Sequence, residues 1–560
     1  MRLLNGYALW ASAFSAPLVL SCSEGRAAQI DHVVILSIDG LHQADLIDPA
    51  TRAYLPNIIG LETKGITYTN ARTTSPSDSF PGTLALVTGA TTRSTGVFYD
   101  DSFARNLYAP GTTLAQINAG TVKPGTEVLM AENVDKNMAL LNGGGNYGKT
   151  AIDPAQLPVD KSGNVVQPWQ YNKTNTIFDI ATAAGKTSYF SDKHPAAYNI
   201  VQGPTGHAVT DFYSPEVAST TAIINGKLVD PSTAPAGTPT GDAVNQLGLT
   251  TNNHLKTEAW DNLKATKLFE ELSGKNAITG ATQAVPSILY SNFQGVSVAQ
   301  KLLTNATGTG GISVDAMGHE TVNPALASAL TNADNIVGNL VQTLVNNGEA
   351  GNTQIILTAK HGQDPRLGAA TLIAASTLTD DLAKAGFEIA QATQDDVALL
   401  WLADQSQAPA LKTFLANYAK THPEIKAIVD GSNFGAPATD NRAPDLIVQL
   451  NQGFIYVGNT ANTRKRAEHG NIYNIDDTGV PLILWGGLDP SRYGLQINAL
   501  VNTTQIAPTI LNDLGLDYTA LDGVRLEGTQ LLPTDVPEPA SFALLAAAVG
   551  GIGLARRKRR

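Results

Sequence analysis

Two continuous apolar runs set the main limits on how this chain can fold. They are HVVILSI at residues 32–38 and TQIILT at residues 353–358, and polar residues follow each run, Asp39 in the first case and Lys360 and His361 in the second. Runs of this kind are typical of strands buried in a parallel sheet that helices cover on both faces. Ligand sites of such sheets lie at the carboxyl ends of the strands. The sequence therefore predicts an α/β fold with a functional site near these polar residues.

A second stretch, SPSDSFPGTLALVTGA at residues 75–90, places the hydroxyl of Ser79 between a polar loop and an apolar run that indicates a helix. The free N–H groups and the dipole at a helix N-terminus favour a phosphoryl oxyanion. A nucleophile at this point would therefore be well placed. From these residues alone a second interpretation stays open, in which the stretch is an ordinary loop that caps a helix.

Composition excludes several classes of protein. The chain has 560 residues, of which 43% are hydrophobic and 15% charged, so it can bury a large core. Its net charge of −12 argues against binding to a nucleic-acid duplex. Its single cysteine, Cys22, lies in the leader described next, so no disulfide framework or thiolate metal site is expected. Any metal ion would be held by histidine, carboxylate and hydroxyl groups.

Residues 1–28 have the pattern of an export signal. Arg2 provides the charged start, residues 9–20 the apolar middle, and small residues follow up to a cleavage point after Ala27. A lipoprotein-type signal with Cys22 as the lipidated residue is the alternative. We expect an exported protein in the periplasm, the cell envelope or the extracellular space.

The other end of the chain carries the order Pro-Glu-Pro at residues 537–539, an apolar run at 540–555 and the basic cluster RRKRR at 556–560. The run is shorter than the roughly 20 residues that a membrane span needs. Residues 536–560 resemble the PEP-CTERM sorting signal. That resemblance implies a transient anchor in the inner membrane, membrane contact through the tail alone, and cleavage by an exosortase-type enzyme. A plain C-terminal anchor is the alternative.

Three fragments, ILSIDG, LPNIIGLETKGITYTNA and DSFPGTLALVTG, follow one another between residues 35 and 89. Together they resemble the alkaline phosphatase superfamily, and within it the type I phosphodiesterases and nucleotide pyrophosphatases. The resemblance implies an α/β/α sandwich around a mostly parallel sheet over residues 31–533, with residues 110–290 as a loop-rich inserted cap. It also implies that Ser79 is the nucleophile and that Asp39 binds a metal ion.

The resemblance further implies two-metal phosphoester chemistry. Histidine, carboxylate and hydroxyl ligands without cysteine suit Zn²⁺, and Mn²⁺ is the alternative. Two ions about 3.5–4 Å apart can activate the attacking oxygen and stabilise the leaving oxygen. The implied ligands are Asp315, His319 and His469 for the first ion, and Asp39, His361 and the Ser79 oxygen for the second.

Two residues depart from the family pattern. Lys360 stands where relatives have an aspartate ligand, and a protonated ammonium group cannot bind a cation. Either the second ion is then absent or weakly held, which we expect, or Lys360 is deprotonated, or it turns towards a carboxylate such as Asp364. Asp100 stands where relatives place an asparagine that holds a phosphate oxygen, so its role as a substrate-binding residue is in question.

A charged turn, Asp-Lys-His-Pro, follows the strand expected near residue 190, inside the predicted cap. Lys193 and His194 of this turn could contact the substrate. A structural role of the histidine within the loop is the alternative.

These features predict a metal-dependent hydrolase of small phosphate esters, whether phosphodiesters, nucleotide pyrophosphates or phosphomonoesters. The reaction would pass through a phospho-serine intermediate at Ser79, with Lys360 as a further catalytic candidate. Two alternatives remain. One is a single-metal hydrolase of phosphate or sulfate esters in which Lys360 replaces a cation, and the other is a decayed envelope protein that binds a phosphorylated ligand.

Overall fold

The structure is a computed structural model, and it describes residues 30–534 except 221, 225–226, 230–252, 306–307, 436–439, 459 and 461–464. The predicted export signal, the lipidation candidate Cys22 and the predicted sorting signal therefore lie outside the described residues.

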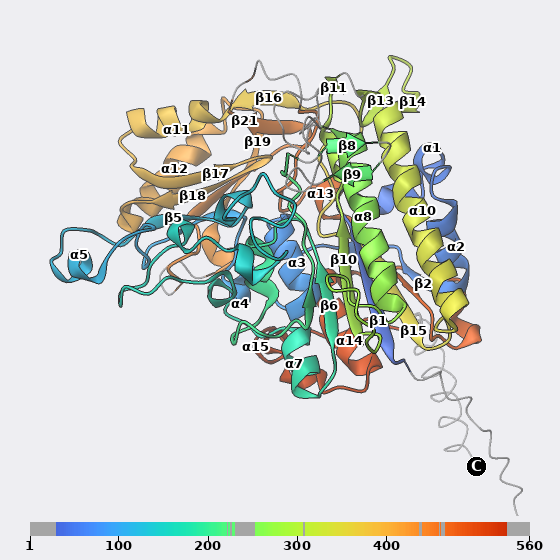
Figure 1. Ribbon diagram of the computed structural model, residues 1–560. Coiled ribbons are helices and arrows are strands. Elements are labelled where there is room, and N and C mark those ends of the chain that lie inside the picture. Colours follow the sequence, from blue (N-terminus) through green and yellow to red (C-terminus); the bar gives the residue numbers. More distant parts are fainter. Residues whose placement is uncertain are drawn as a thin grey trace, which may run out of the picture.

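An eight-stranded sheet forms the centre of the molecule (Figure 1). Its strands, in spatial order, are β23 (Leu495–Ile497), β2 (Gly65–Tyr68), β22 (Ile483–Trp485), β15 (Thr353–Thr358), β1 (His32–Ile38), β10 (Ile288–Phe293), β6 (Ser188–Ser191) and β7 (Asp211–Phe212). Every neighbouring pair is parallel except the two pairs that include β22. The two apolar runs that the sequence analysis began with are β1 and β15, at the predicted bounds.

Helices cover both faces of this sheet. Helices α2 (Pro56–Lys64), α8 (His254–Leu272), α9 (Gly295–Lys301) and α10 (Pro324–Asn347) pack on one face, and α3 (Ser79–Thr88), α7 (Ile177–Ala183) and α14 (Ile506–Asp513) pack on the other (Figure 1). Alternate residues of β1 enter the two cores, since Val34 and Leu36 contact the first set of helices while Val33 and Ile35 contact the second. The predicted α/β/α sandwich is thus confirmed.

The register between β6 and β10 is continuous, from Ser188 opposite Ile288 to Ser191 opposite Ser291. The rings of Phe190 and Tyr290, which are opposite one another, stack with centroids 4.6 Å apart. Strands β6 and β7 belong to the central sheet although they lie within residues 110–290. The region predicted as an inserted cap is therefore not wholly separate from the core, because its fully buried strand β6 pairs with β10.

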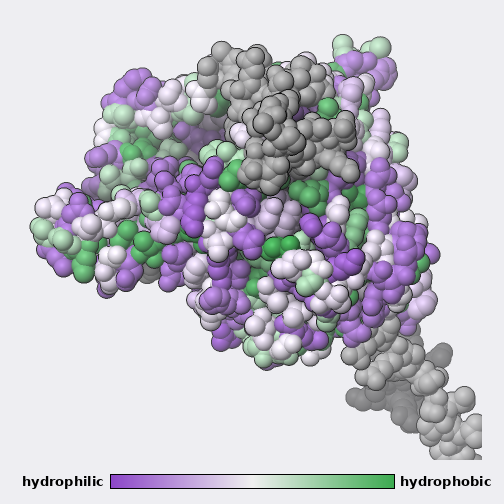
Figure 2. Space-filling model, viewed as in Figure 1, coloured by the Kyte–Doolittle hydropathy of each residue, from purple (hydrophilic) through white to green (hydrophobic). Residues whose placement is uncertain are grey.

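A second sheet, which the sequence analysis did not separate from the rest, lies beside the first (Figure 1). Its antiparallel strands are β17 (Ile389–Gln394), β18 (Val397–Leu402), β20 (Leu446–Leu450) and β19 (Ile425–Asp430). Helices α11 (Ala375–Lys384) and α12 (Ala408–Tyr418) pack against it and share a hydrophobic core with it. Hydrophilic side chains cover most of the face seen in Figure 2, with small hydrophobic groups between them.

Helix α3 begins at Ser79 because Asp78 caps it. The Asp78 carboxylate accepts a hydrogen bond of 2.9 Å from the backbone N–H of Phe80. Gly89 ends the helix in the left-handed conformation, with φ of 69°, which suits glycine. All residues of the helix are buried, so Ser79 lies at the buried, positive end of the helix dipole.

Candidate active site

Two basic side chains contact the hydroxyl of Ser79. The Lys193 ammonium Nζ donates to Ser79 Oγ at 2.9 Å, and His361 Nε2 lies 3.2 Å from the same oxygen. The other ring nitrogen of His361, Nδ1, lies 2.8 Å from the carbonyl oxygen of Gly362. A proton on Nδ1 satisfies that carbonyl and leaves the Nε2 lone pair free to accept the Ser79 proton. The site thus holds a hydroxyl between a proton acceptor and a positive charge.

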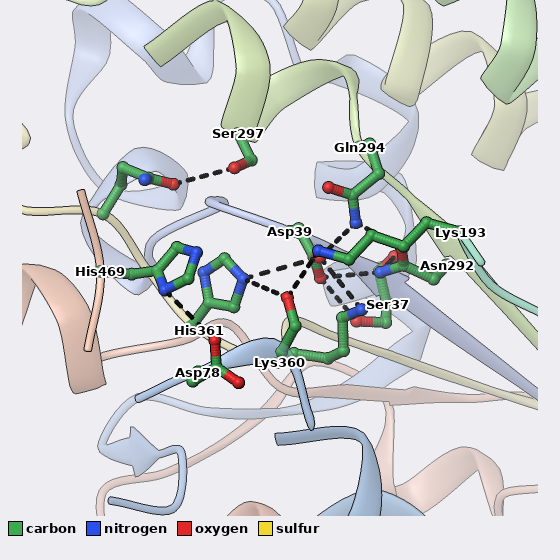
Figure 3. Close-up of polar contacts among 12 residues, drawn as sticks. Ser37, Asp39, Asp78, Lys193, Asn292, Gln294, Ser297, Lys360, His361 and His469 are labelled. Carbon is green, nitrogen blue, oxygen red and sulfur yellow. Dashed lines mark hydrogen bonds and ion pairs between the residues drawn. The ribbon is translucent and has the colours of Figure 1, made fainter. Parts of the chain in front are cut away.

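A buried ion-pair group lies next to the hydroxyl. The Lys360 ammonium Nζ lies 3.2 Å from Asp39 (Figure 3) and 3.1 Å from Asp192. All three side chains are fully buried. Lys360 also donates to the Tyr198 hydroxyl at 3.1 Å. Burial alone would lower the pKa of Lys360, but Asp192 and Asp39 outweigh it and raise that pKa. Lys360 is therefore a charged ammonium group.

Both carboxylate oxygens of Asp39 accept hydrogen bonds from side-chain amides. Asn292 donates to Oδ1 at 2.7 Å, and Gln294 donates to Oδ2 (Figure 3). Both amides lie at the carboxyl end of β10, the strand beside β1. Burial would raise the pKa of Asp39, but Lys360, His361 and Lys193 lower it to about 2. The carboxylate is therefore ionised and satisfied by protein groups.

A second imidazole lies against the first. The rings of His361 and His469 have centroids 3.9 Å apart, and His469 Nδ1 lies 3.9 Å from the Asp78 carboxylate (Figure 3). Burial lowers the pKa of His361 to about 3 and the pKa of His469 well below its ordinary value. Both rings are therefore neutral at pH 7.

A cavity of about 190 Å³ opens beside these groups. The predicted substrate-binding residues Asp100, Lys193 and His194 all line it, together with His469. The Nδ1 atom of His194 lies 2.9 Å from the buried carboxylate of Glu216, which fixes the ring. Burial and the charge of Asp78 raise the pKa of Asp100 to about 7. The structure brings these three residues to one cavity, and their contact with substrate stays a prediction.

Asp315 and His319 lie elsewhere. They are in the turn between β13 (Ile312–Val314) and β14 (Glu320–Val322), which extends beyond the N-terminal end of α10 (Figure 1). Their side chains are 47% and 69% exposed, and His319 Nδ1 lies 2.9 Å from Asp315 Oδ2. His469 is buried beside His361 instead. The structure thus separates the three residues predicted to share the first ion, because Asp315 and His319 satisfy each other within a local turn.

Comparison with known proteins identifies the family of this chain. The model of the type I phosphodiesterase / nucleotide pyrophosphatase family matches residues 33–194 and 257–472, which is more than half of the chain. The chain belongs to this family. It is accordingly a phosphoric ester hydrolase. No protein with a curated description matches the chain in sequence.

Solved structures of the family share the fold. The chain is similar to human ectonucleotide pyrophosphatase / phosphodiesterase 5, with 13% identity and a TM-score of 0.53 over 90% of this chain and 97% of that one. It is also similar to the murine protein of that name, with 12% identity and a TM-score of 0.52 over 87% of this chain and 96% of that one. An inactive variant of the murine protein was solved in complex with AMP. At this identity the likeness shows the fold alone.

The PEP-CTERM protein-sorting motif matches residues 535–560, which implies export and association with the cell envelope. Within the part of the chain that the structure describes, none of the helices is both long and apolar enough to cross a membrane.

Phosphodiesterases of this family depend on metal ions, so we tested whether these residues fit a two-ion centre. Among the described residues, no group of three or more His, Cys, Asp or Glu side chains could hold an ion. Asp39 and His361 do approach one another, with Oδ2 and Nε2 3.6 Å apart, but the ammonium of Lys360 lies beside them. Two unit charges 4 Å apart repel by about 4 kcal/mol at an effective dielectric constant of 20, and a dication doubles this. The residues do not fit the two-ion centre.

Several side chains of the site, besides that of Tyr198, were not predicted from the sequence. They are Asp78, Asp192, Asn292 and Gln294. Asp78 directly precedes α3, Asp192 directly follows β6, and Asn292 and Gln294 lie at the carboxyl end of β10. The signal that could have found them is the placement of polar residues at the carboxyl ends of β6 and β10, the strands that continue the sheet beyond β1.

We expect acid to remove stability that Asp39 provides. Its pKa is lowered from 3.8 to about 2 in the folded chain, so its contribution is complete above pH 4 and is lost as the pH falls towards 2. The Asp39→Asn substitution should therefore lower the free energy of unfolding more at pH 5 than at pH 2, and the difference should be about 2 kcal/mol. Denaturant titration measures both values. A pH-independent difference at Asp39 would contradict the expectation.

Proposed function

We propose that this chain hydrolyses phosphate esters through attack of Ser79 Oγ on phosphorus, with a phospho-Ser79 intermediate. The observation that supports this is the position of the Ser79 hydroxyl, between Lys193 Nζ and His361 Nε2 at the N-terminus of α3. The ammonium and the helix N-terminus stabilise a negative charge on the serine oxygen, and the imidazole can accept the hydroxyl proton, as nucleophilic catalysis by serine requires.

In the first step the bond between Ser79 Oγ and phosphorus forms, and the bond to the leaving oxygen breaks. His361 Nε2 accepts the hydroxyl proton, and this proton then passes to the leaving oxygen. In the second step water attacks phosphorus, the Ser79 ester bond breaks, and a proton returns to Ser79 Oγ. Throughout, the ammonium of Lys193 stabilises the negative charge on the serine and phosphoryl oxygens.

The substrate class is a small phosphate ester. The cavity of about 190 Å³ is smaller than the roughly 300 Å³ at which drug-sized sites begin, so it takes the phosphoryl group and few further atoms. The rest of the substrate would then lie outside the cavity. AMP, which the murine structure contains, is a suitable probe of a nucleotide-type substrate.

An assay with para-nitrophenyl phosphate and bis(para-nitrophenyl) phosphate tests this function. We expect hydrolysis of at least one of the two esters and none of para-nitrophenyl sulfate. Turnover of the sulfate ester alone would contradict the proposal. Zinc is not part of the proposal, because the described residues do not fit the two-ion centre.

We also propose that the C-terminal tail is removed after export. The PEP-CTERM match at residues 535–560 supports this. Intact mass spectrometry of the protein recovered from its native envelope should therefore show a chain that lacks residues 556–560 and the leader at 1–28. Replacing Glu538 by alanine should leave the tail attached and serves as the control. Recovery of the full-length chain from the cytoplasm would contradict this prediction.

A further inference from the structure

We propose that Lys193 and Lys360 take the place of divalent cations in this chain, so that the Ser79 site binds a phosphoryl group without a metal ion. The inference rests on the proposed function of Ser79. The two lysines have different tasks. Lys360 neutralises the buried carboxylates of Asp39 (Figure 3) and Asp192, and Lys193 contacts Ser79 Oγ and lines the cavity.

Lys360 neutralises the charge that a bound cation would otherwise balance. Its Nζ lies 3.2 Å from Asp39 and 3.1 Å from Asp192, and the Lys360 side chain is fully buried. A carboxylate that stays charged when buried is paired with a positive group or binds a metal ion. Since one ammonium is shared by two carboxylates, this group of three carries a net charge of −1 before Lys193 is added.

Lys193 supplies the positive charge that remains. Its Nζ donates to Ser79 Oγ at 2.9 Å and also lines the cavity. No carboxylate of the described residues lies within ion-pair distance of this Nζ. By contrast, Lys301 lines the same cavity but pairs with Glu468 at 2.7 Å. Lys193 is thus the ammonium of this cavity that can pair with an incoming phosphoryl oxygen.

The charges of Asp39, Asp192, Lys193 and Lys360 balance without an ion. The carboxylates of Asp39 and Asp192 are matched by the ammonium groups of Lys193 and Lys360. The amides of Asn292 and Gln294 point N–H groups at Asp39, the carboxylate that would have to turn its lone pairs to a metal. A dication placed there would meet two ammonium groups, whereas a phosphoryl anion meets a charge of the right sign.

Phosphate binding by metal-free protein tests this inference separately from catalysis. The purified chain is dialysed against a chelator, its metal content is measured by mass spectrometry, and inorganic phosphate is titrated into it by calorimetry. Wild type should bind phosphate with less than about 0.1 metal ion per chain. Lys193→Met should weaken binding at least about tenfold, the loss expected when one charged hydrogen bond is removed.

Three further variants serve as controls. Lys193→Arg keeps the charge and should still bind phosphate, which shows that the position tolerates substitution. Lys275→Met, at an exposed lysine, should bind as wild type does. Ser79→Ala should also bind phosphate, because it keeps both lysines. Metal-free protein that binds phosphate but hydrolyses no ester would contradict the proposed function and support this inference.

Two results would overturn the inference. In one, the chelated wild type does not bind phosphate, and Zn²⁺ or Mn²⁺ restores binding at one or two ions per chain. In the other, folded Lys193→Met binds phosphate as tightly as wild type does.

Discussion

Ser79→Ala should abolish phosphate-ester hydrolysis, with a loss in kcat on the order of 10⁴–10⁶. The reason is that the hydroxyl between Lys193 and His361 is the oxygen that would bond to phosphorus. Steady-state kinetics with a para-nitrophenyl ester measures the loss. Thermal unfolding should change little, because alanine fits the first position of α3 without a new clash.

A nearby hydroxyl provides the matched control. The Ser75 hydroxyl donates to the carbonyl oxygen of Ile472 at 3.2 Å and contacts neither Lys193 nor His361. Ser75→Ala should therefore keep most of the activity. If Ser79→Ala retains more than about a tenth of wild-type turnover, the assignment of the nucleophile is wrong.

Lys360→Met should lower the free energy of unfolding by about 3–5 kcal/mol, because it leaves the buried carboxylates of Asp39 and Asp192 without their shared partner. Denaturant unfolding followed by circular dichroism measures this. Adding Asp39→Asn to the variant should recover part of the loss, since it removes one of the uncompensated charges. A loss below about 1 kcal/mol would indicate that Lys360 is not a charged partner of these groups.

Lys360→Asp tests the same position by reversing the sign of its charge. It replaces an ammonium by a carboxylate next to Asp39 and His361, which adds a ligand and removes a repulsive charge. The variant should be destabilised without metal and should gain bound zinc, measured by equilibrium dialysis with metal analysis. Wild-type protein that already retains two tightly bound ions would contradict this expectation.

Much of the fold followed from periodicity. Strands β1 and β15 are continuous apolar runs, and the polar residues at their ends, Asp39 and His361, do lie together next to Ser79. The second sheet was harder to recognise, because β17 is only partly buried and its sequence, IAQATQ, lacks a continuous apolar run.

The differences between the predicted and the observed arrangement of the site have a common physical origin. The spacing D-x-x-x-H in residues 315–319 suits a metal ion and suits a hydrogen-bonded turn equally, and the turn is what forms. Lys360 pairs with Asp192 as well as Asp39, and not with Asp364, whose carboxylate accepts from the N–H of Gly453 at 2.8 Å. Asp192 is distant in the chain, so its contact depends on the place of β6 in the sheet, which local sequence does not encode.

The position of β6 in the central sheet affects the electrostatic potential at Ser79. Asp192 and Lys193 are consecutive residues after the strand, and one contacts Lys360 while the other contacts Ser79. A slip of β6 by one residue would turn each of its side chains to the other face of the sheet and would move Asp192 and Lys193 by one position. A carboxylate would then face the serine, and two ammonium groups would face each other. The pairing of Phe190 with Tyr290 thus determines the sign of the potential at the nucleophile.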